Sequence, residues 1–191
     1  QFSQAVWADE VALARWGQKD KWMQLYGLRA AEVARIWSDV FAGEAEKRLV
    51  NVISSQTGWL GLETEAFTAP LAVAEGMEPP VDAFDAYAVT GYFGGVLGLE
   101  DRQEMVKTWL AESAAKARGK GEAQGLKGKA LETYIAAHRF DHATALAERE
   151  LTDGSVSGNA ADTLQDLIGR VWPHHAQVAR AQGLDLVLYE G

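Results

Sequence analysis

The chain has no cysteine, few prolines and no long apolar run, and each shortage excludes a class of protein. Its 191 residues include four prolines and no cysteine. A disulfide and a thiolate nucleophile are therefore both excluded, and the redox state of the compartment cannot be read from the sequence. No apolar run approaches the roughly 20 residues that cross a bilayer. We therefore expect no membrane partner.

Basic residues are also too few for a nucleic-acid-binding surface. There are 18 Lys and Arg against 27 Asp and Glu, which gives a net charge of −9. A general nucleic-acid binder carries a basic footprint, so we expect no nucleic-acid partner. The glycines at 91, 94 and 95 do not form a dinucleotide fingerprint, and no Gly-Lys-Ser/Thr phosphate loop occurs. No cofactor is expected.

Tryptophan is the residue that the chain has in unusual number. Seven Trp occur in a chain long enough for one sizeable core. Trp is costly to bury completely and suits the wall of a ligand cleft. The plainer interpretation is that these large side chains pack between helices.

Three short apolar runs alternate with long helical patterns. The runs cover residues 48–54, 84–90 and 185–190. This alternation of strand and helix patterns predicts an α/β fold in which three parallel strands lie side by side in that order, with helices on one side. The first run is so continuous that we expect both faces of its strand to be covered.

Helical patterns occupy most of the remaining chain. We expect helices within residues 3–43, 61–76, 100–118, 128–150 and 162–180, with breaks at Pro70, 119–125 and Pro173. Residues 120–158 exceed what a simple crossover needs, which indicates a helical insertion or a lid.

One helical stripe is aromatic and aliphatic. Trp22, Tyr26, Arg29, Val33, Trp37 and Val40 follow the spacing of a single helix face. The simplest interpretation is a face buried against the sheet, and the alternative is an aromatic row that binds a cofactor.

Polar and aromatic residues follow each predicted strand. Glu190 lies at the tip of the last strand, where a carboxylate can act as a nucleophile or a proton carrier. Tyr92 follows the second strand, and its phenol can hold a neighbouring carboxylate ionised by a hydrogen bond. The plainer alternatives are a rim salt bridge for Glu190 and a packed ring for Tyr92.

Gln56 and Trp59 follow the first strand. The amide of Gln56 offers paired donor and acceptor atoms, and the indole of Trp59 offers a flat apolar face. Together they suit a sugar ring, although either residue can equally fix its own loop.

The histidines give a weaker signal. His138 and His142 are four residues apart on a predicted helix, which places both rings on one face, as in a zinc-binding helix. The Glu that normally follows the first His is missing, so surface histidines are the default interpretation. His174 and His175 follow Pro173 and indicate a helix start more than a metal site.

These runs resemble a known family. Residues 48–56, 84–94 and 184–191 look like strands five, six and seven of the retaining (β/α)8 glycoside hydrolases of clan A. The phrase Asp-Ala-Tyr-Ala-Val-Thr-Gly-Tyr-Phe-Gly at 85–94 is the closest fit and is similar to uncharacterised bacterial cellulase-like barrel proteins.

The resemblance implies a fold, an activity and roles for residues. Residues 1–191 would be the C-terminal half of a TIM-barrel catalytic domain. Glu190 would be the nucleophile of a retaining hydrolase and Tyr92 would orient it. Gln56, Trp59 and Phe93 would bind a carbohydrate substrate, without a metal. An extracellular or periplasmic location is favoured by the resemblance alone.

One departure from the family pattern limits what this chain can do. The general acid/base of the clan is a Glu directly after an Asn, and no Asn-Glu pair occurs here. The simplest interpretation is an excerpt that needs the remainder of the barrel as its partner, so the isolated chain should be inactive. The alternatives are a non-catalytic carbohydrate-binding or scaffold protein, and a metal-dependent α/β enzyme that uses His138 and His142.

Overall fold

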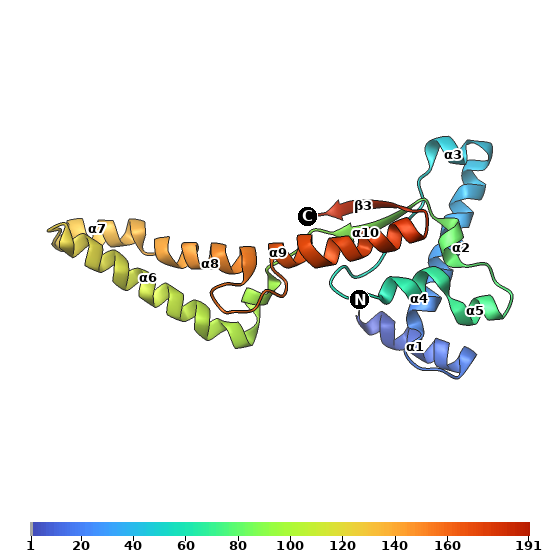
Figure 1. Cartoon of the computed structure of the whole chain (residues 1–191), viewed down its shortest axis with the longest axis horizontal. Helices are drawn as coiled ribbons and strands as arrows, with labels where there is room; N and C mark the ends of the chain where they lie inside the picture. Colours follow the sequence, from blue (N-terminus) through green and yellow to red (C-terminus); the bar gives the residue numbers. More distant parts are fainter. Residues whose placement is uncertain (1) are drawn as a thin grey trace. The chain divides into compact units, whose positions relative to one another are not determined.

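The computed structural model describes residues 2–191, which form two compact units. Unit 1 combines the chain up to Gly91 with Val171–Gly191, and unit 2 is Tyr92–Arg170. The elements of unit 1 are α1 (Phe2–Trp16), α2 (Trp22–Phe41), a 3-10 turn (Ala42–Glu44), α3 (Ala45–Arg48), β1 (Val52–Ser54), α4 (Leu62–Thr68), α5 (Pro70–Ala74), a 3-10 turn (Pro80–Ala83), β2 (Ala86–Thr90), α10 (Trp172–Ala181) and β3 (Asp185–Glu190) (Figure 1).

The three strands form one parallel sheet in the order β1-β2-β3. Ile53 pairs with Tyr87, and Tyr87 pairs with Leu186 on its other side. The predicted order and direction are confirmed. The first strand is shorter than expected, because residues 45–48 form α3 and pairing begins only at Val52.

One face of the sheet carries the core of unit 1. Ile53, Tyr87 and Val89 point to the same side, because alternate residues of a strand share a face. They are buried in one cluster with Met23 of α2, Ala66 and Phe67 of α4, Ala179 of α10 and Leu184. The ring of Phe67 meets that of Tyr87 edge to face, with 5.0 Å between centroids. Helices therefore cover this face.

The opposite face is apolar and largely uncovered within the described residues. Val52 in β1 is 46% exposed and Val187 in β3 is 39% exposed. In the central strand, the small residues Ala86 and Ala88 are buried there. The expectation that both faces of the first strand are covered is therefore wrong for this chain.

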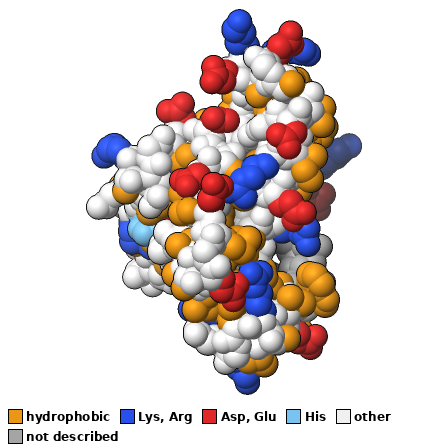
Figure 2. All heavy atoms as spheres, turned by 90° about the vertical axis from the view of Figure 1, so that its right-hand side faces the viewer, with side chains coloured by type: hydrophobic (Ala, Val, Ile, Leu, Met, Phe, Trp, Pro, Cys, Tyr) orange, Lys and Arg blue, Asp and Glu red, His pale blue; other side chains and the backbone are white. Residues whose placement is uncertain are grey.

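Most of the apolar stripe of α2 is exposed, contrary to the prediction, and only its first residue, Trp22, packs against the core. Val33, Trp37 and Val40 face solvent, and the buried face of the helix is Met23, Gln24, Gly27, Ala31 and Ala34. Small residues are buried there because α2 and α4 approach closely at Gly27. Figure 2 looks onto this side of unit 1, where hydrophobic side chains lie among acidic and basic ones.

Unit 2 is helical. Its elements are two 3-10 turns (Gly95–Gly98 and Glu100–Arg102), α6 (Gln103–Ala123), α7 (Gly128–His138), α8 (Asp141–Asp153) and α9 (Leu164–Asp166). α7 and α8 run back along α6 (Figure 1). The predicted insertion at 120–158 lies within this unit. The predicted break at 119–125 is largely wrong, because α6 continues through Gly119 and Gly121 to Ala123.

The predicted break at Pro173 is confirmed. A π-helical turn, Leu167–Val171, precedes α10, and the proline occupies the first turn of that helix. A proline is tolerated there because its missing N–H has no partner within the helix. Across residues 2–191, the structure holds no helix with the length and apolar character needed to cross a bilayer.

Candidate functional site

Glu190 is the last residue of β3 and is exposed at the carboxyl end of the sheet. Its backbone carbonyl accepts a hydrogen bond from the N–H of Gly91, with 2.7 Å between the atoms. The pairing of β2 with β3 is irregular between Val89 and Thr90, so that Thr90 lies opposite Glu190. The strand thus delivers a carboxylate to the edge of the sheet at which parallel α/β proteins carry their chemistry.

Gln56 and Trp59 lie in the loop that follows β1, at the same edge of the sheet. The N–H of Trp59 donates to the carbonyl of Gln56 at 3.0 Å, which closes a tight turn. The Trp59 side chain is 53% exposed, whereas Gln56 is half-buried. The loop therefore presents an indole that is accessible to solvent.

Tyr92 and Phe93 open unit 2, whereas Glu190 closes unit 1. Both aromatic side chains are exposed. The predicted hydrogen bond from the Tyr92 phenol to the Glu190 carboxylate stays a prediction, and so does a shared cleft with Gln56.

A buried chain of polar groups lies beneath the carboxyl end of the sheet. The Nε2–H of His175 donates to the carbonyl of Thr57 at 2.9 Å. Because a carbonyl can only accept, Nδ1 of His175 must accept the hydrogen bond that it shares with the Tyr87 hydroxyl, also at 2.9 Å. Ser55 in turn donates to Tyr87 at 2.5 Å. Every member of this chain has a partner, which is what burial of polar groups requires.

Burial sets the ionisation of this chain. It lowers the pKa of His175, and the hydrogen bond to Thr57 and the charge of Glu63 oppose this shift only in part. It also raises the pKa of the Tyr87 phenol well above its ordinary value, against the opposing hydrogen bond from Ser55. The imidazole and the phenol are therefore both neutral near pH 7.

The Thr57 side chain links the loop after β1 to the last residue of β2 by hydrogen bonds. Its hydroxyl accepts from the N–H of Thr90 at 2.8 Å and from the Thr90 hydroxyl at 2.9 Å. The indole N–H of Trp172 donates to the Thr90 carbonyl at 3.2 Å. The start of α10 is thus attached directly to the end of the central strand.

A second buried group joins α4 to α10. Glu63 is fully buried, and its two oxygens accept the N–H of Gly61 at 3.1 and 3.0 Å. Oε1 of Glu63 also lies 2.6 Å from Nε2 of His174, a side chain that is 33% exposed. The carboxylate therefore has one backbone partner and one imidazole partner in an otherwise closed site.

The described residues contain one group of three potential metal ligands, and it is Glu63, His174 and His175. One candidate ligand atom from each residue lies within 4.8 Å of the others. Sequence reasoning found the two histidines but assigned them to a helix start, which is where they lie. It missed Glu63, whose local sequence looks like an ordinary helix start.

The predicted histidine pair on the insertion has other partners. Nδ1 of His138 lies 2.8 Å from Asp141, and Nε2 of His142 lies 2.6 Å from Nζ of Lys116. A lysine ammonium beside an imidazole disfavours a cation at that nitrogen. The residues described around His138 and His142 thus do not form a metal site.

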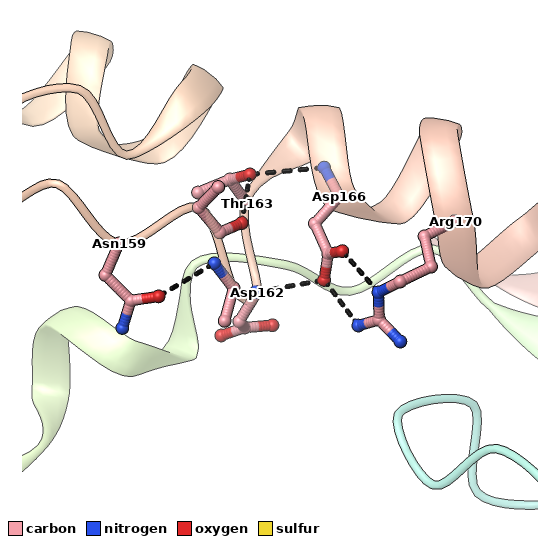
Figure 3. Close-up of polar contacts among 7 residues, drawn as sticks. Asn159, Asp162, Thr163, Asp166 and Arg170 are labelled. Carbon is pink, nitrogen blue, oxygen red and sulfur yellow. Dashed lines mark hydrogen bonds and ion pairs between the residues drawn. The ribbon is translucent and has the colours of Figure 1, made fainter.

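Figure 3 shows the polar contacts that close the last loop of unit 2. The Thr163 hydroxyl caps α9 by accepting the N–H of Asp166 at 3.2 Å. Both oxygens of Asp166 accept from the Arg170 guanidinium, at 2.6 and 2.7 Å. This pair lowers the pKa of Asp166. The contacts order the loop and resemble no catalytic arrangement.

No family model, curated protein or solved structure matches the chain. Its function is therefore inferred from its own residues.

Proposed function

We propose that this chain forms the nucleophile side of a retaining glycoside hydrolase with a (β/α)8 barrel. One observation carries the proposal: β3, at the edge of a parallel sheet, ends on the exposed carboxylate of Glu190. Catalytic groups of parallel barrels lie at the carboxyl ends of their strands. A carboxylate in that place can attack an anomeric carbon and form a glycosyl-enzyme intermediate.

The uncovered face of the sheet supports a barrel. In a (β/α)8 barrel, helices cover the outer face and apolar side chains of the inner face fill the interior. Here helices cover the face of Tyr87, and the opposite face carries the exposed apolar residues Val52 and Val187. Each of β1 and β3 pairs with β2 alone among the described strands. We propose that further strands, the remainder of the barrel, continue the sheet at both edges.

The proposed roles divide between two carboxyl groups. Glu190 attacks, and a second carboxyl group about 5 to 5.5 Å away protonates the leaving oxygen. That second group would come from another strand of the barrel. Tyr92 would hold Glu190 ionised, and Trp59 with Gln56 and Phe93 would contact the sugar.

The test is hydrolysis by the intact protein across a panel of β-linked polysaccharides. We expect Glu190→Gln to lower kcat by about a thousandfold or more while substrate binding survives, because the lost bond forms only in the reaction. Asp185→Asn is the matched control, since this exposed carboxylate lies at the other end of the same strand. It should leave kcat unchanged.

Two results would contradict the proposal. Near-normal turnover by Glu190→Gln on the best substrate would remove Glu190 from the mechanism. Binding of glycans by the intact protein without hydrolysis of any would instead support a carbohydrate-binding module, to which the exposed Trp59 is equally suited.

A further inference from the structure

We propose that Glu63, His174 and His175 form a binding site for Zn²⁺ or a similar divalent transition-metal ion. The three side chains come from the start of α4 and the start of α10, at the carboxyl end of the sheet. Two imidazoles and one carboxylate make a donor set that holds zinc in proteins and leaves a position open. This site is separate from Glu190 and independent of the proposed hydrolysis.

The spacing of the ligand atoms suits a metal ion. They lie within 4.8 Å of one another. Around a tetrahedral zinc, ligand atoms at about 2.0 to 2.1 Å from the ion are about 3.3 Å apart. The Glu63–His174 contact of 2.6 Å would open by about 0.7 Å, and the remaining separations would close.

The partners of His175 can exchange the proton between its two ring nitrogens when a metal ion binds, and the Thr57 carbonyl then gives up its donor. Without metal, Nε2–H donates to Thr57 and Nδ1 accepts from Tyr87. When Nε2 binds a cation, its proton must lie on Nδ1, which can then donate to the Tyr87 oxygen. Tyr87 would donate in turn to Ser55, because a hydroxyl is both donor and acceptor. A metal-bound histidine ordinarily donates its second N–H in this way.

The charge of Glu63 and the access through His174 favour a cation. Glu63 is a fully buried carboxylate, and no lysine or arginine bonds to it among the described residues. A buried carboxylate is costly unless a cation or several donors face it. His174 is partly exposed, which gives an ion a route from solvent.

The first experiment adds Zn²⁺ to the chain and measures affinity by competition with a chromophoric chelator. We expect one equivalent to bind and Tm to rise by roughly 5 to 10 °C at about a hundredfold excess over Kd. A chelator should reverse the rise. Mg²⁺, which prefers oxygen ligands, should leave Tm unchanged. Absence of Zn²⁺ binding would overturn the proposal.

Variants locate the ion. We expect His174→Gln and Glu63→Gln each to weaken Zn²⁺ binding by about a hundredfold or more. The matched control is the double variant His138→Gln/His142→Gln, which removes the other two histidines of the chain and should bind normally. Binding that survives both site variants, or that is lost in the control, would overturn the proposal.

If a variant of the buried Glu63 does not fold, a spectroscopic measurement on the wild type can still identify the zinc ligands. X-ray absorption of the Zn²⁺-loaded wild type should show two imidazoles and oxygen ligands at about 2.0 to 2.2 Å. Fewer than two imidazoles would overturn the assignment.

Discussion

At the scale of single residues, Asp166 shows how one carboxylate can order a loop. Its oxygens accept from both the ε and η nitrogens of Arg170 and from the N–H of Asp162 (Figure 3). Asp162 has a left-handed backbone, with φ of 59°, which a side chain rarely adopts without local support. The ionised carboxylate is the stronger acceptor, so this support weakens when Asp166 is protonated.

We therefore expect the contribution of Asp166 to depend on pH. Its pKa is lowered in the folded chain by the Arg170 pair, so its stabilisation is present above the unfolded pKa near 3.8 and is lost as the pH falls through the folded pKa. Asp166→Asn should cost about 0.5 to 1 kcal/mol at pH 7, since the pair is partly exposed. Urea unfolding should show this difference vanish near pH 2.

The control for this experiment is Asp101→Asn. Asp101 is also next to an arginine, but its closest approach to Arg102 is 3.8 Å and its side chain is exposed. The variant should change stability little at either pH. An Asp166→Asn effect that is equal at pH 7 and pH 2 would show that the loop depends on shape and not on charge.

Residue types at strand ends were predictable, and long-range partners were not. Glu190 could be assigned to a strand tip because an uninterrupted apolar run leads to it. Glu63 and His174 are far apart in the chain, and the sequence around each gives no indication that the other is its partner. They meet only because the fold places the starts of α4 and α10 near each other at the carboxyl end of the sheet.

At the scale of elements, a glycine decides how α2 packs. A Cβ built on Gly27 would lie 1.9 Å from the backbone oxygen of Ala66 in α4. The two helices can therefore approach this closely only because residue 27 has no side chain. The larger residues Val33 and Trp37 remain on the outer face. Periodicity identified an apolar face but could not show that small residues form the buried one.

We expect Gly27→Ala to destabilise unit 1 by about 2 kcal/mol, because backbone must move and no flexible side chain can yield. The matched control is Gly119→Ala. Gly119 also lies inside a long helix, but a Cβ there meets nothing within 4 Å. This variant should stabilise the chain by about 0.5 to 1 kcal/mol, since alanine is the better helix former. Thermal unfolding of both would test the opposite signs.

Two glycines with different roles explain why the predicted break at 119–125 was largely wrong. Gly121 is a packing position, where a Cβ would come within 2.6 Å of Leu131 in α7. Gly125, with φ of +77°, adopts the left-handed backbone just after the helix ends. The sequence does not distinguish the two glycines. Only the position of α7 shows that Gly121 makes a helix contact and that Gly125 lies where the helix ends.

At the scale of the whole molecule, unit 2 is an insertion between β2 and α10. The chain leaves unit 1 after Gly91 and returns at Val171. These two points are neighbours, because a Cβ on Gly91 would lie 3.5 Å from the Trp172 ring. An insertion whose ends are adjacent can be removed without stretching its host.

We therefore expect unit 1 to fold when residues 93–169 are replaced by a short Gly-Ser linker. The near-ultraviolet circular dichroism of its tryptophans should be retained, since Trp172 keeps its bond to Thr90. Residues 92–170 expressed alone should be helical and melt cooperatively. Loss of the tryptophan signal in the shortened chain would show that unit 1 needs the insertion.

The hydrogen bond between Gly94 and Asp162, near the two ends of unit 2, affects the order in which the chain folds. Residues 91–184 separate β2 from β3, and a parallel pairing across so long a stretch forms slowly. The N–H of Gly94 donates to the carbonyl of Asp162 at 2.8 Å, which holds the two ends of the insertion together. Once the helices of the insertion have formed, the diffusional search that brings β3 beside β2 spans only a short effective loop. We therefore expect a segment outside the sheet to accelerate the assembly of the sheet.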